Sequence, residues 1–256
     1  VGIKGEWRHG DDITYIDGGK IYTDTITAEQ IAAGTITASK INMADFINLP
    51  SDENLVGYWS FDEGSGALAV DGSGHGNNGT LVDMAEEDWV DGVVGKALDF
   101  AGDDDYVEIP DDESLDILDG FTIAFWTKYS LGQGGGVDRR DGAGEGYFLL
   151  FQDTGKIAIC LNDGINQVFR VNIGAGYNDG EWYHGVFTGS LSSGVAKVYV
   201  DSEQVGLDID ISSITGTITP DKALNIGRST AIWFTIGLMD EVRIYKRGLT
   251  EAEIKA

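Results

Sequence analysis

Cysteine is almost absent from the sequence, where Cys160 is the only one among 256 residues. A single cysteine excludes a disulfide within the chain and any metal site built from several thiolates. Cys160 lies in the apolar stretch KIAICL, which has the composition of a buried strand. We therefore expect a buried thiol rather than a nucleophile.

Positive charge is also scarce, because 17 lysine and arginine residues face 43 aspartate and glutamate residues and give a formal net charge of −26. Binding to nucleic acid or to anionic lipid headgroups requires clustered lysine and arginine, so neither partner is expected. The acidity has two explanations, namely solubility or adaptation to a saline medium on the one hand, and an affinity for divalent cations on the other. Composition alone favours the first.

Long apolar runs are missing as well. No stretch approaches the length that spans a bilayer, and the N-terminus lacks the pattern of a signal peptide. We expect no membrane insertion. If the protein acts outside a cell, we expect it to leave by another route, such as cell lysis.

Glycine is abundant, at 37 residues, whereas stretches with a helical period are few. Short segments alternate like strands and are separated by glycine and aspartate turns. They lie near residues 56–61, 79–82, 97–101, 105–109, 121–129, 147–152, 156–161, 167–173, 182–188, 195–201, 223–227 and 236–245. This pattern predicts two stacked antiparallel sheets. The final TEAEI has the capping-box signature of a short helix.

One stretch, residues 55–80, joins an alternating strand to a loop rich in aspartate, glycine and asparagine. Its motifs YWSFDEGSG and DGSGHGNNGT resemble the opening of laminin-G-like, concanavalin A-like jelly-roll domains. The later motifs KALDF, DYVEIP, FTIAFW, EWYH, VYVD and LMDEVRIY continue the resemblance in the same order. The resemblance implies an all-β, two-sheet antiparallel jelly-roll sandwich over residues 51–256. That fold hosts many activities and does not identify one.

The N-terminal part contains an internal repeat, TITAxxI, at residues 25–31 and 35–41. A unit of about ten residues cannot bury its own isoleucines, so they need partners, which symmetry-related copies can supply. The stretch GGKIYTDTITAEQIAAGTITASKI is similar to segments of tail-fibre and tail-tip proteins of tailed bacteriophages, whose chains form trimers. This likeness implies that residues 1–50 are a small β and turn segment that forms a homotrimer. A flexible linker is the alternative.

Oxygen donors are dense in and beside the loop that follows the first strand. Calcium takes six to eight oxygen ligands from carboxylates, amides and main-chain carbonyls. In the resembling family, a structural calcium often lies where this loop meets the Asp-Glu pair of the last long strand. The resemblance therefore implies a calcium ion held by Asp62, Asp71, Asn77 and Asp240. The alternative is that these side chains only cap turns.

Catalytic patterns are weak. A glycosidase needs two carboxylates facing each other across a sugar, and fold-related glucanases carry a Glu-x-Asp-x-Glu strand that is missing here. The chain also lacks the Gly-x-Ser-x-Gly motif. The glycine-rich residues 132–136 lack the Lys-Ser/Thr sequel of a phosphate loop and predict a long mobile connection. We therefore expect no enzyme, and a polysaccharide depolymerase is the least favoured alternative.

Sugar binding is the function that these exclusions leave. Sugar rings stack on exposed aromatic side chains, and their hydroxyl groups bond to polar side chains in loops. The candidates in connecting stretches and around the glycine-rich loop are Trp89, Arg139, Arg140, Tyr147 and Trp233. Each of them could equally be an ordinary loop residue.

Together, these patterns predict a receptor-binding protein of a phage tail fibre or tail tip, located in the virion and acting extracellularly. Residues 51–256 would bind a host-surface glycan, and residues 1–50 would join three copies and contact other virion proteins. A structural virion decoration that binds no sugar is the alternative from another class.

Overall fold

The computed structural model describes residues 52–102, 104–140, 144–229 and 233–255. The chain divides into two units, Val1–Pro50 and Ser51–Ala256, and every described residue belongs to the second. The TITAxxI repeat lies outside the described residues. The domain boundary and the homotrimer therefore stay predictions.

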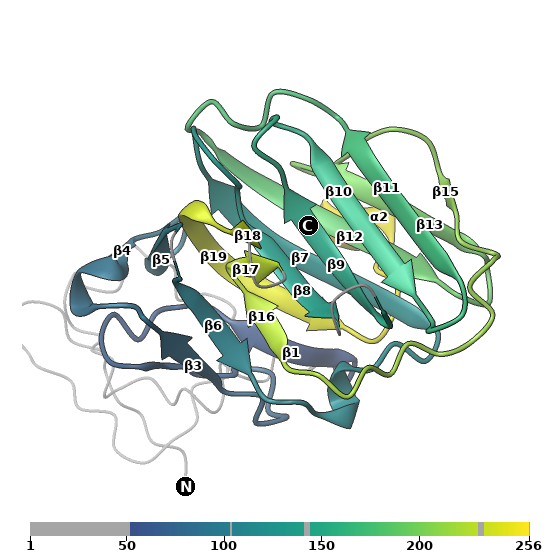
Figure 1. The fold of residues 1–256 in the computed structure, drawn as a ribbon, viewed down its shortest axis with the longest axis horizontal. Coiled ribbons are helices and arrows are strands. Elements are labelled where there is room, and N and C mark those ends of the chain that lie inside the picture. The colour runs from purple at the N-terminus through teal and green to yellow at the C-terminus, as the bar shows by residue number, and fades with distance from the viewer. Residues whose placement is uncertain (1–51, 103, 141–143, 230–232, 256) are drawn as a thin grey trace, which may run out of the picture. The chain divides into compact units, whose positions relative to one another are not determined.

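The second unit contains two large antiparallel sheets (Figure 1). The first has the strand order β14-β13-β12-β7-β19-β5-β4, with β1 paired to β19 and β15 paired to β13. Its strands are β1 (Leu55–Trp59), β4 (Trp89–Asp91), β5 (Lys96–Ala101), β7 (Gly120–Lys128), β12 (Trp182–Ser190), β13 (Val195–Val200), β14 (Glu203–Gln204), β15 (Ile209–Asp210) and β19 (Ile236–Tyr245). We call it the nine-stranded sheet.

The second, eight-stranded sheet has the order β11-β10-β9-β8-β16-β6-β3-β2. Its strands are β2 (Leu68–Ala69), β3 (Gly79–Val82), β6 (Tyr106–Ile109), β8 (Gly136–Arg140), β9 (Gly146–Phe151), β10 (Ile157–Asn162), β11 (Gln167–Ile173) and β16 (Leu224–Ile226). A small separate hairpin pairs β17 (Arg228–Ser229) with β18 (Trp233–Phe234). Among the described residues, the helical elements are two 3₁₀ turns, Glu86–Asp88 and Glu113–Leu115, and the helix α2 (Glu251–Ile254).

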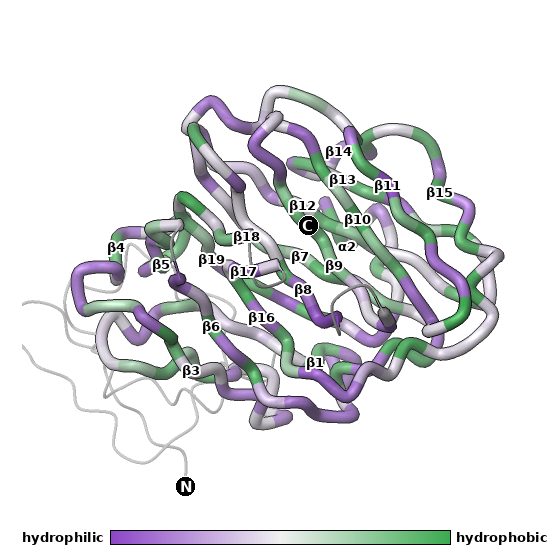
Figure 2. Tube along the Cα trace, viewed as in Figure 1, coloured by the Kyte–Doolittle hydropathy of each residue, from purple (hydrophilic) through white to green (hydrophobic). Residues whose placement is uncertain are grey.

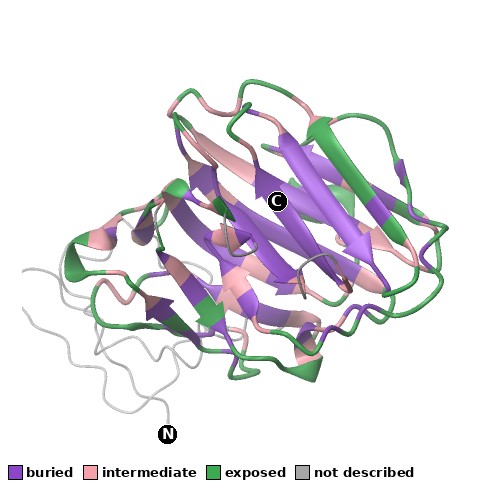
Figure 3. Ribbon diagram, viewed as in Figure 1, coloured by how far each residue is buried: buried purple, intermediate pink, exposed green. Residues whose placement is uncertain are grey.

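Apolar side chains from both sheets fill the space between them. The core contains, among others, Trp59, Phe125, Leu149 and Phe151, each fully buried. Strands β9 and β10 are buried at every residue (Figure 3), and most of their residues are hydrophobic (Figure 2). Because successive side chains point to opposite faces of a strand, both faces of this part of the eight-stranded sheet must be covered.

The all-β, two-sheet class that the sequence predicts is confirmed. Each predicted strand has a counterpart in the structure, and the capping box at Thr250 is formed with Glu253. The prediction of a long mobile connection after the glycine-rich residues is wrong in part, because residues 136–140 form β8 between β9 and β16. In the described part of the chain, no helix is long and apolar enough to cross a membrane.

Candidate functional site

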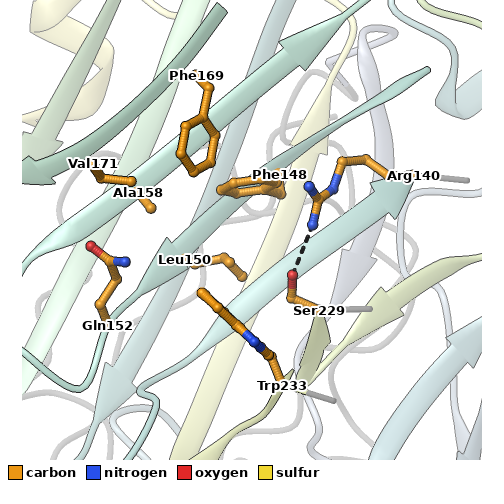
Figure 4. A pocket seen from close by; sticks show the side chains of 9 residues that line it. All are labelled: Arg140, Phe148, Leu150, Gln152, Ala158, Phe169, Val171, Ser229 and Trp233. Carbon is orange, nitrogen blue, oxygen red and sulfur yellow. Dashed lines mark hydrogen bonds between the residues drawn. The ribbon is translucent and has the colours of Figure 1, made fainter. Parts of the chain in front are cut away.

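The outer face of the eight-stranded sheet carries a cleft of about 300 Å³ (Figure 4). Successive side chains of a strand point to opposite faces, so every second residue of β9 points away from the core and forms the bottom of the cleft. The lining side chains come from β8 to β11, from Gln152 directly after β9, and from the β17–β18 hairpin. They are Arg140, Phe148, Leu150, Gln152, Ala158, Phe169, Val171, Ser229 and Trp233.

Aromatic side chains form two sides of the cleft. Phe148 and Phe169 meet edge to face with ring centroids 5.9 Å apart, and Trp233 projects from the hairpin in Figure 4. Phe148 is buried, whereas Phe169 is 47% and Trp233 is 40% exposed. Exposed aromatic surface beside buried apolar surface is the arrangement that stacks the apolar face of a ligand ring.

The hairpin that carries Trp233 rests on the glycine-rich residues. The amide N–H of Ile236 donates to the carbonyl of Gln133 at 2.7 Å. The hydroxyl of Thr235 donates to the carbonyl of Gly134 at 3.1 Å, and Thr235 is buried. These contacts tie the residues directly after the hairpin to the glycine-rich connection and so help to set the position of Trp233.

A closed polar cluster occupies one end of the cleft. The Nε and Nη2 groups of Arg140 donate to the carboxylate of Asp138 at 2.8 and 2.6 Å. Nη2 also donates to the hydroxyl of Ser229 at 3.0 Å, and that hydroxyl donates to Asp138. Burial acts to lower the pKa of Arg140, but its bonds with Asp138 outweigh burial and raise it. The guanidinium lies 4.1 Å from the centre of the Phe148 ring.

The side-chain amide of Gln152 lies at the end of the cleft opposite Arg140 (Figure 4). Its Oε1 atom is shielded from solvent and has no hydrogen-bond partner among the described residues. A buried acceptor without a partner lowers stability, so such groups are uncommon and call for an explanation. Gln152 was not among the residues that the sequence suggested.

The structure brings together two of the five predicted sugar-binding residues, Arg140 and Trp233. Arg139 points to the other face of β8, is 1% exposed and pairs with Asp111 and Asp116. This part of the prediction is not retained, because Arg139 has almost no surface to offer a ligand.

Tyr147 and Trp89 are also placed away from the cleft. Tyr147 is fully buried and donates its hydroxyl to the carbonyl of Leu115 at 2.9 Å. Trp89 is 7% exposed and donates Nε1 to the carbonyl of Gly66 at 3.2 Å. Both side chains are structural, and we do not retain them as sugar contacts.

Phe148 and Phe169 are cleft residues that sequence reasoning missed. A signal was present in β9, whose sequence GYFLLF is apolar on both faces. A strand of that kind needs cover on its outer face as well as its inner one. The covering residues could not be identified, because they come from distant parts of the chain.

Two of the predicted calcium ligands, Asp62 and Asp240, meet the same segment, residues 92–96. Asp62 Oδ1 accepts the N–H of Lys96 at 2.8 Å. Asp240 Oδ2 accepts the N–H groups of Val93 and Val94 at 2.8 and 3.1 Å. A Cβ atom at Gly95 would lie 1.8 Å from Asp62 Oδ1. Glycine at this position is therefore required for the close approach.

Asp240 is fully buried, and its Oδ1 atom has no hydrogen-bond partner. Burial raises its pKa to about 6, against the lowering effect of the N–H groups of Val94 and Val93. A bare carboxylate oxygen in such a place fits a cation, which would neutralise it. In the ranges that the structure describes, no three histidine, cysteine, aspartate or glutamate side chains gather to hold a metal. A cation here would need main-chain carbonyls and water as further ligands.

The other two predicted ligands, Asp71 and Asn77, organise the first loop. The Asp71 carboxylate accepts the N–H groups of Tyr58, Ser73 and Asn77 at 2.8 to 3.0 Å. Asn77 Nδ2 donates to the carbonyl of Val56 at 2.7 Å. These bonds match the turn-capping alternative. Within the described ranges, the three predicted carboxylate ligands Asp62, Asp71 and Asp240 do not gather as one metal-binding group.

Comparison with known proteins supports the fold independently. Residues 101–255 match the family model described as the Concanavalin A-like lectin/glucanases superfamily, Laminin_G_3. No curated protein matches the sequence.

Three solved structures illustrate the similarity. The binding domain of Paraclostridial Mosquitocidal Protein 1 aligns with a TM-score of 0.61 and 17% identity, over 80% of this chain and 52% of that one. Domain 4 of AbnA, a GH43 extracellular arabinanase from Geobacillus stearothermophilus in complex with arabinotriose, gives 0.59 and 19%, over 79% and 97%. The receptor binding domain of botulinum neurotoxin D gives 0.58 and 16%, over 80% and 52%.

These identities establish a shared fold only, and the chain spans about half the length of the two toxin domains. The family model, by contrast, matches more than half of this chain, from residue 101 to residue 255. The chain therefore belongs to the concanavalin A-like lectin/glucanases superfamily.

Proposed function

We propose that residues 51–256 form a carbohydrate-binding module without catalytic activity, and that the cleft beside Trp233 is its binding site. The main support is that Trp233 is 40% exposed and lines a cleft whose bottom is formed by Phe148. Sugar-binding sites combine such stacking surface with a few polar groups, here Arg140 and Gln152. The arabinanase domain that shares the fold was solved with arabinotriose, which supports a sugar as the ligand class.

A glycan array with the whole protein, followed by titration of the bound glycans, tests this proposal. Trp233→Ala is expected to weaken binding by at least ~10-fold, since stacked aromatics are frequent hot spots. Trp182→Ala is the matched control, because Trp182 begins β12 on the other sheet. Both variants should keep the melting temperature of the wild type within a few degrees.

The outcomes separate the alternatives. Binding that survives Trp233→Ala unchanged would remove the cleft as the site. A protein that binds no glycan at all would favour the virion decoration. Release of reducing sugar from a bound polysaccharide would reveal the depolymerase.

We further propose that residues 1–50 join three copies at a phage tail fibre or tail tip, where the module faces a host-surface glycan outside the cell and neighbours other virion proteins. The support is the TITAxxI repeat and its likeness to tail-fibre segments. Trimerisation would compensate for a weak single site, because linked sites can raise avidity by about 10² to 10⁴.

We also propose a structural calcium ion between Asp62 and Asp240, supported by the unpartnered Oδ1 of Asp240. The ion would neutralise this buried carboxylate. Main-chain N–H groups already tie both aspartates to residues 92–96. Calcium would therefore strengthen the junction of β19 with this segment.

A further inference from the structure

We infer that the cleft selects a neutral sugar and that the side-chain amide of Gln152 is its polar anchor. The inference rests on the proposed function and adds the chemical class of the ligand. Two observations support it. The charge of Arg140 in the cleft is balanced by Asp138, and the Oε1 atom of Gln152 has no hydrogen-bond partner in the described part of the chain.

Arg140 is the only charged side chain among the residues that line the cleft within the described ranges. Its charge is balanced by Asp138, a 3% exposed carboxylate that takes two hydrogen bonds from the guanidinium. An acidic sugar would have to compete with Asp138 for Arg140. Doing so would leave a buried carboxylate without its partner, which is costly.

The negative charge of the whole chain also disfavours an acidic sugar. A net charge of −26 repels anionic ligands over the distance that salt leaves unscreened. An uncharged sugar escapes this repulsion. Its stacking on the exposed rings of Trp233 and Phe169 needs no charge.

Arg140 and Ser229 in the cleft are already bonded to Asp138, whereas the Oε1 atom of Gln152 has no partner among the residues that the structure describes. No hydrogen bond holds its side-chain amide to another described residue, and Oε1 is a buried acceptor without a partner. The terminal torsion of glutamine is broad, so an unbonded amide can turn either its oxygen or its NH₂ group toward a ligand. A hydroxyl group both donates and accepts, so it pairs with the amide in either orientation, whereas a carboxylate can only accept.

The size of the cleft limits what else can enter. A volume of about 300 Å³ is at the lower end of the range for small-ligand sites. It suits one sugar residue, or a short segment of a chain, and the longer part of a glycan would lie outside. We therefore place the contacted sugar residue between Trp233 and the Phe148–Phe169 pair, with a hydroxyl at Gln152.

The test compares neutral and acidic glycans on the whole protein. An array that includes arabinotriose, lactose, sialyllactose and trigalacturonate identifies the ligands, and titration at low and high salt measures their affinities. We expect neutral glycans to bind with little dependence on salt and their acidic counterparts to bind at least ~10-fold more weakly, as expected for an uncompensated charge.

Gln152→Leu tests the anchor, with Gln204→Leu as the control because Gln204 is exposed on β14 of the other sheet. Gln152→Leu should weaken binding of the neutral glycan about 5- to 10-fold, the value of one hydrogen bond. Its melting temperature without ligand should be equal to or above that of the wild type, since an unpaired buried acceptor is removed. Gln204→Leu should change neither quantity.

Other results would overturn either the inference or the proposed function. Acidic glycans that bind more tightly than neutral ones, and that lose binding in Trp233→Ala, would overturn the inference while keeping the proposed function. Unchanged affinity in Gln152→Leu would overturn the anchor. If both Gln152→Leu and Gln152→Met lose stability together with binding, Gln152 is structural and the anchor is again overturned. A wild type that binds no glycan would overturn the proposed function itself.

Discussion

Arg139 and Arg140 are neighbours in β8 and lie on opposite faces of the eight-stranded sheet. Arg139 faces inward, where Nη1 donates to Asp116 at 2.8 Å. Arg140 faces outward and lines the cleft. The two side chains have the same chemistry, so the pleat of the strand alone decides that one stabilises the fold and the other belongs to the candidate site.

Replacement of Arg139 should therefore affect stability and spare binding. Arg139→Met leaves Asp111 and Asp116 without their cation, and we expect a loss of about 3 kcal/mol in the free energy of unfolding. Lys197→Met is the control, because its pair with Asp208 is exposed and should be worth less than about 1 kcal/mol. Urea titration gives both values. A loss of glycan affinity in Arg139→Met at temperatures where it stays folded would contradict this division of roles.

The strands could be predicted from the sequence because alternation is local, as in Phe121–Trp126 and Val198–Asp201. Strand β8 could not, since GVDRR has no alternation of apolar residues and is a strand only through its pairing with β9 and β16. Composition does not tell which face a residue occupies. For that reason Arg139 and Arg140 were indistinguishable before the structure.

The cleft was predictable only in part. Trp233 and Arg140 were found because an aromatic or basic residue in a connecting stretch is a reasonable binding candidate. Phe169 and Gln152 were missed, because their role depends on long-range packing of β9 and β11 near the β17–β18 hairpin. The same limit applies to the proposed cation site, where Asp62 and Asp240 both accept main-chain N–H groups of residues 92–96.

Removal of calcium should lower the melting temperature of the wild type. Without the ion, the buried Asp240 carboxylate has an unpartnered oxygen, which opposes folding. We expect EDTA to lower the melting temperature by several degrees, calcium to restore it, and magnesium to restore it less, because magnesium demands a stricter geometry. Differential scanning calorimetry on the dialysed protein measures this.

Two variants distinguish the predicted ligands from each other. Asp240→Asn should abolish the effect of calcium, whereas Asp71→Asn should lower the melting temperature equally with and without calcium, because Asp71 caps main-chain N–H groups. If EDTA leaves the melting temperature of the wild type unchanged, the calcium proposal is wrong.

His184 should make stability depend on pH between about pH 4 and 6.5. It stacks on Trp126 with ring centroids 5.0 Å apart. Burial, aided by the charge of Arg243 and opposed by Asp201, lowers its pKa to about 4. The unfolded chain binds a proton near pH 6.5, so the contribution of neutral His184 is complete above that pH and is lost as pH falls toward 4.

The comparison with His184→Gln isolates this contribution from the many carboxylates. Between pH 7 and pH 5, the wild type should lose on the order of 1–2 kcal/mol more than the variant in the free energy of unfolding. Urea titrations of both proteins at the two pH values provide the four numbers. Parallel losses in the two proteins would show that His184 titrates normally in the folded state.

The mass in solution tests whether the N-terminal repeat assembles the protein. The four isoleucines of the two TITAxxI copies need apolar partners, and the likeness to tail-fibre segments implies three chains, so light scattering on the full chain should give three times the mass of one chain. A chain that begins at Ser51 should be a monomer. That start keeps Asp52, whose carboxylate accepts from Arg247 Nε at 2.9 Å and so ties the beginning of the module to its end.

If the full chain is a monomer, residues 1–50 act as a linker, and the avidity argument for a weak sugar site fails. If the shortened chain still forms trimers, residues 51–256 themselves make the contacts between copies. The role of the TITAxxI repeat in assembly is then wrong.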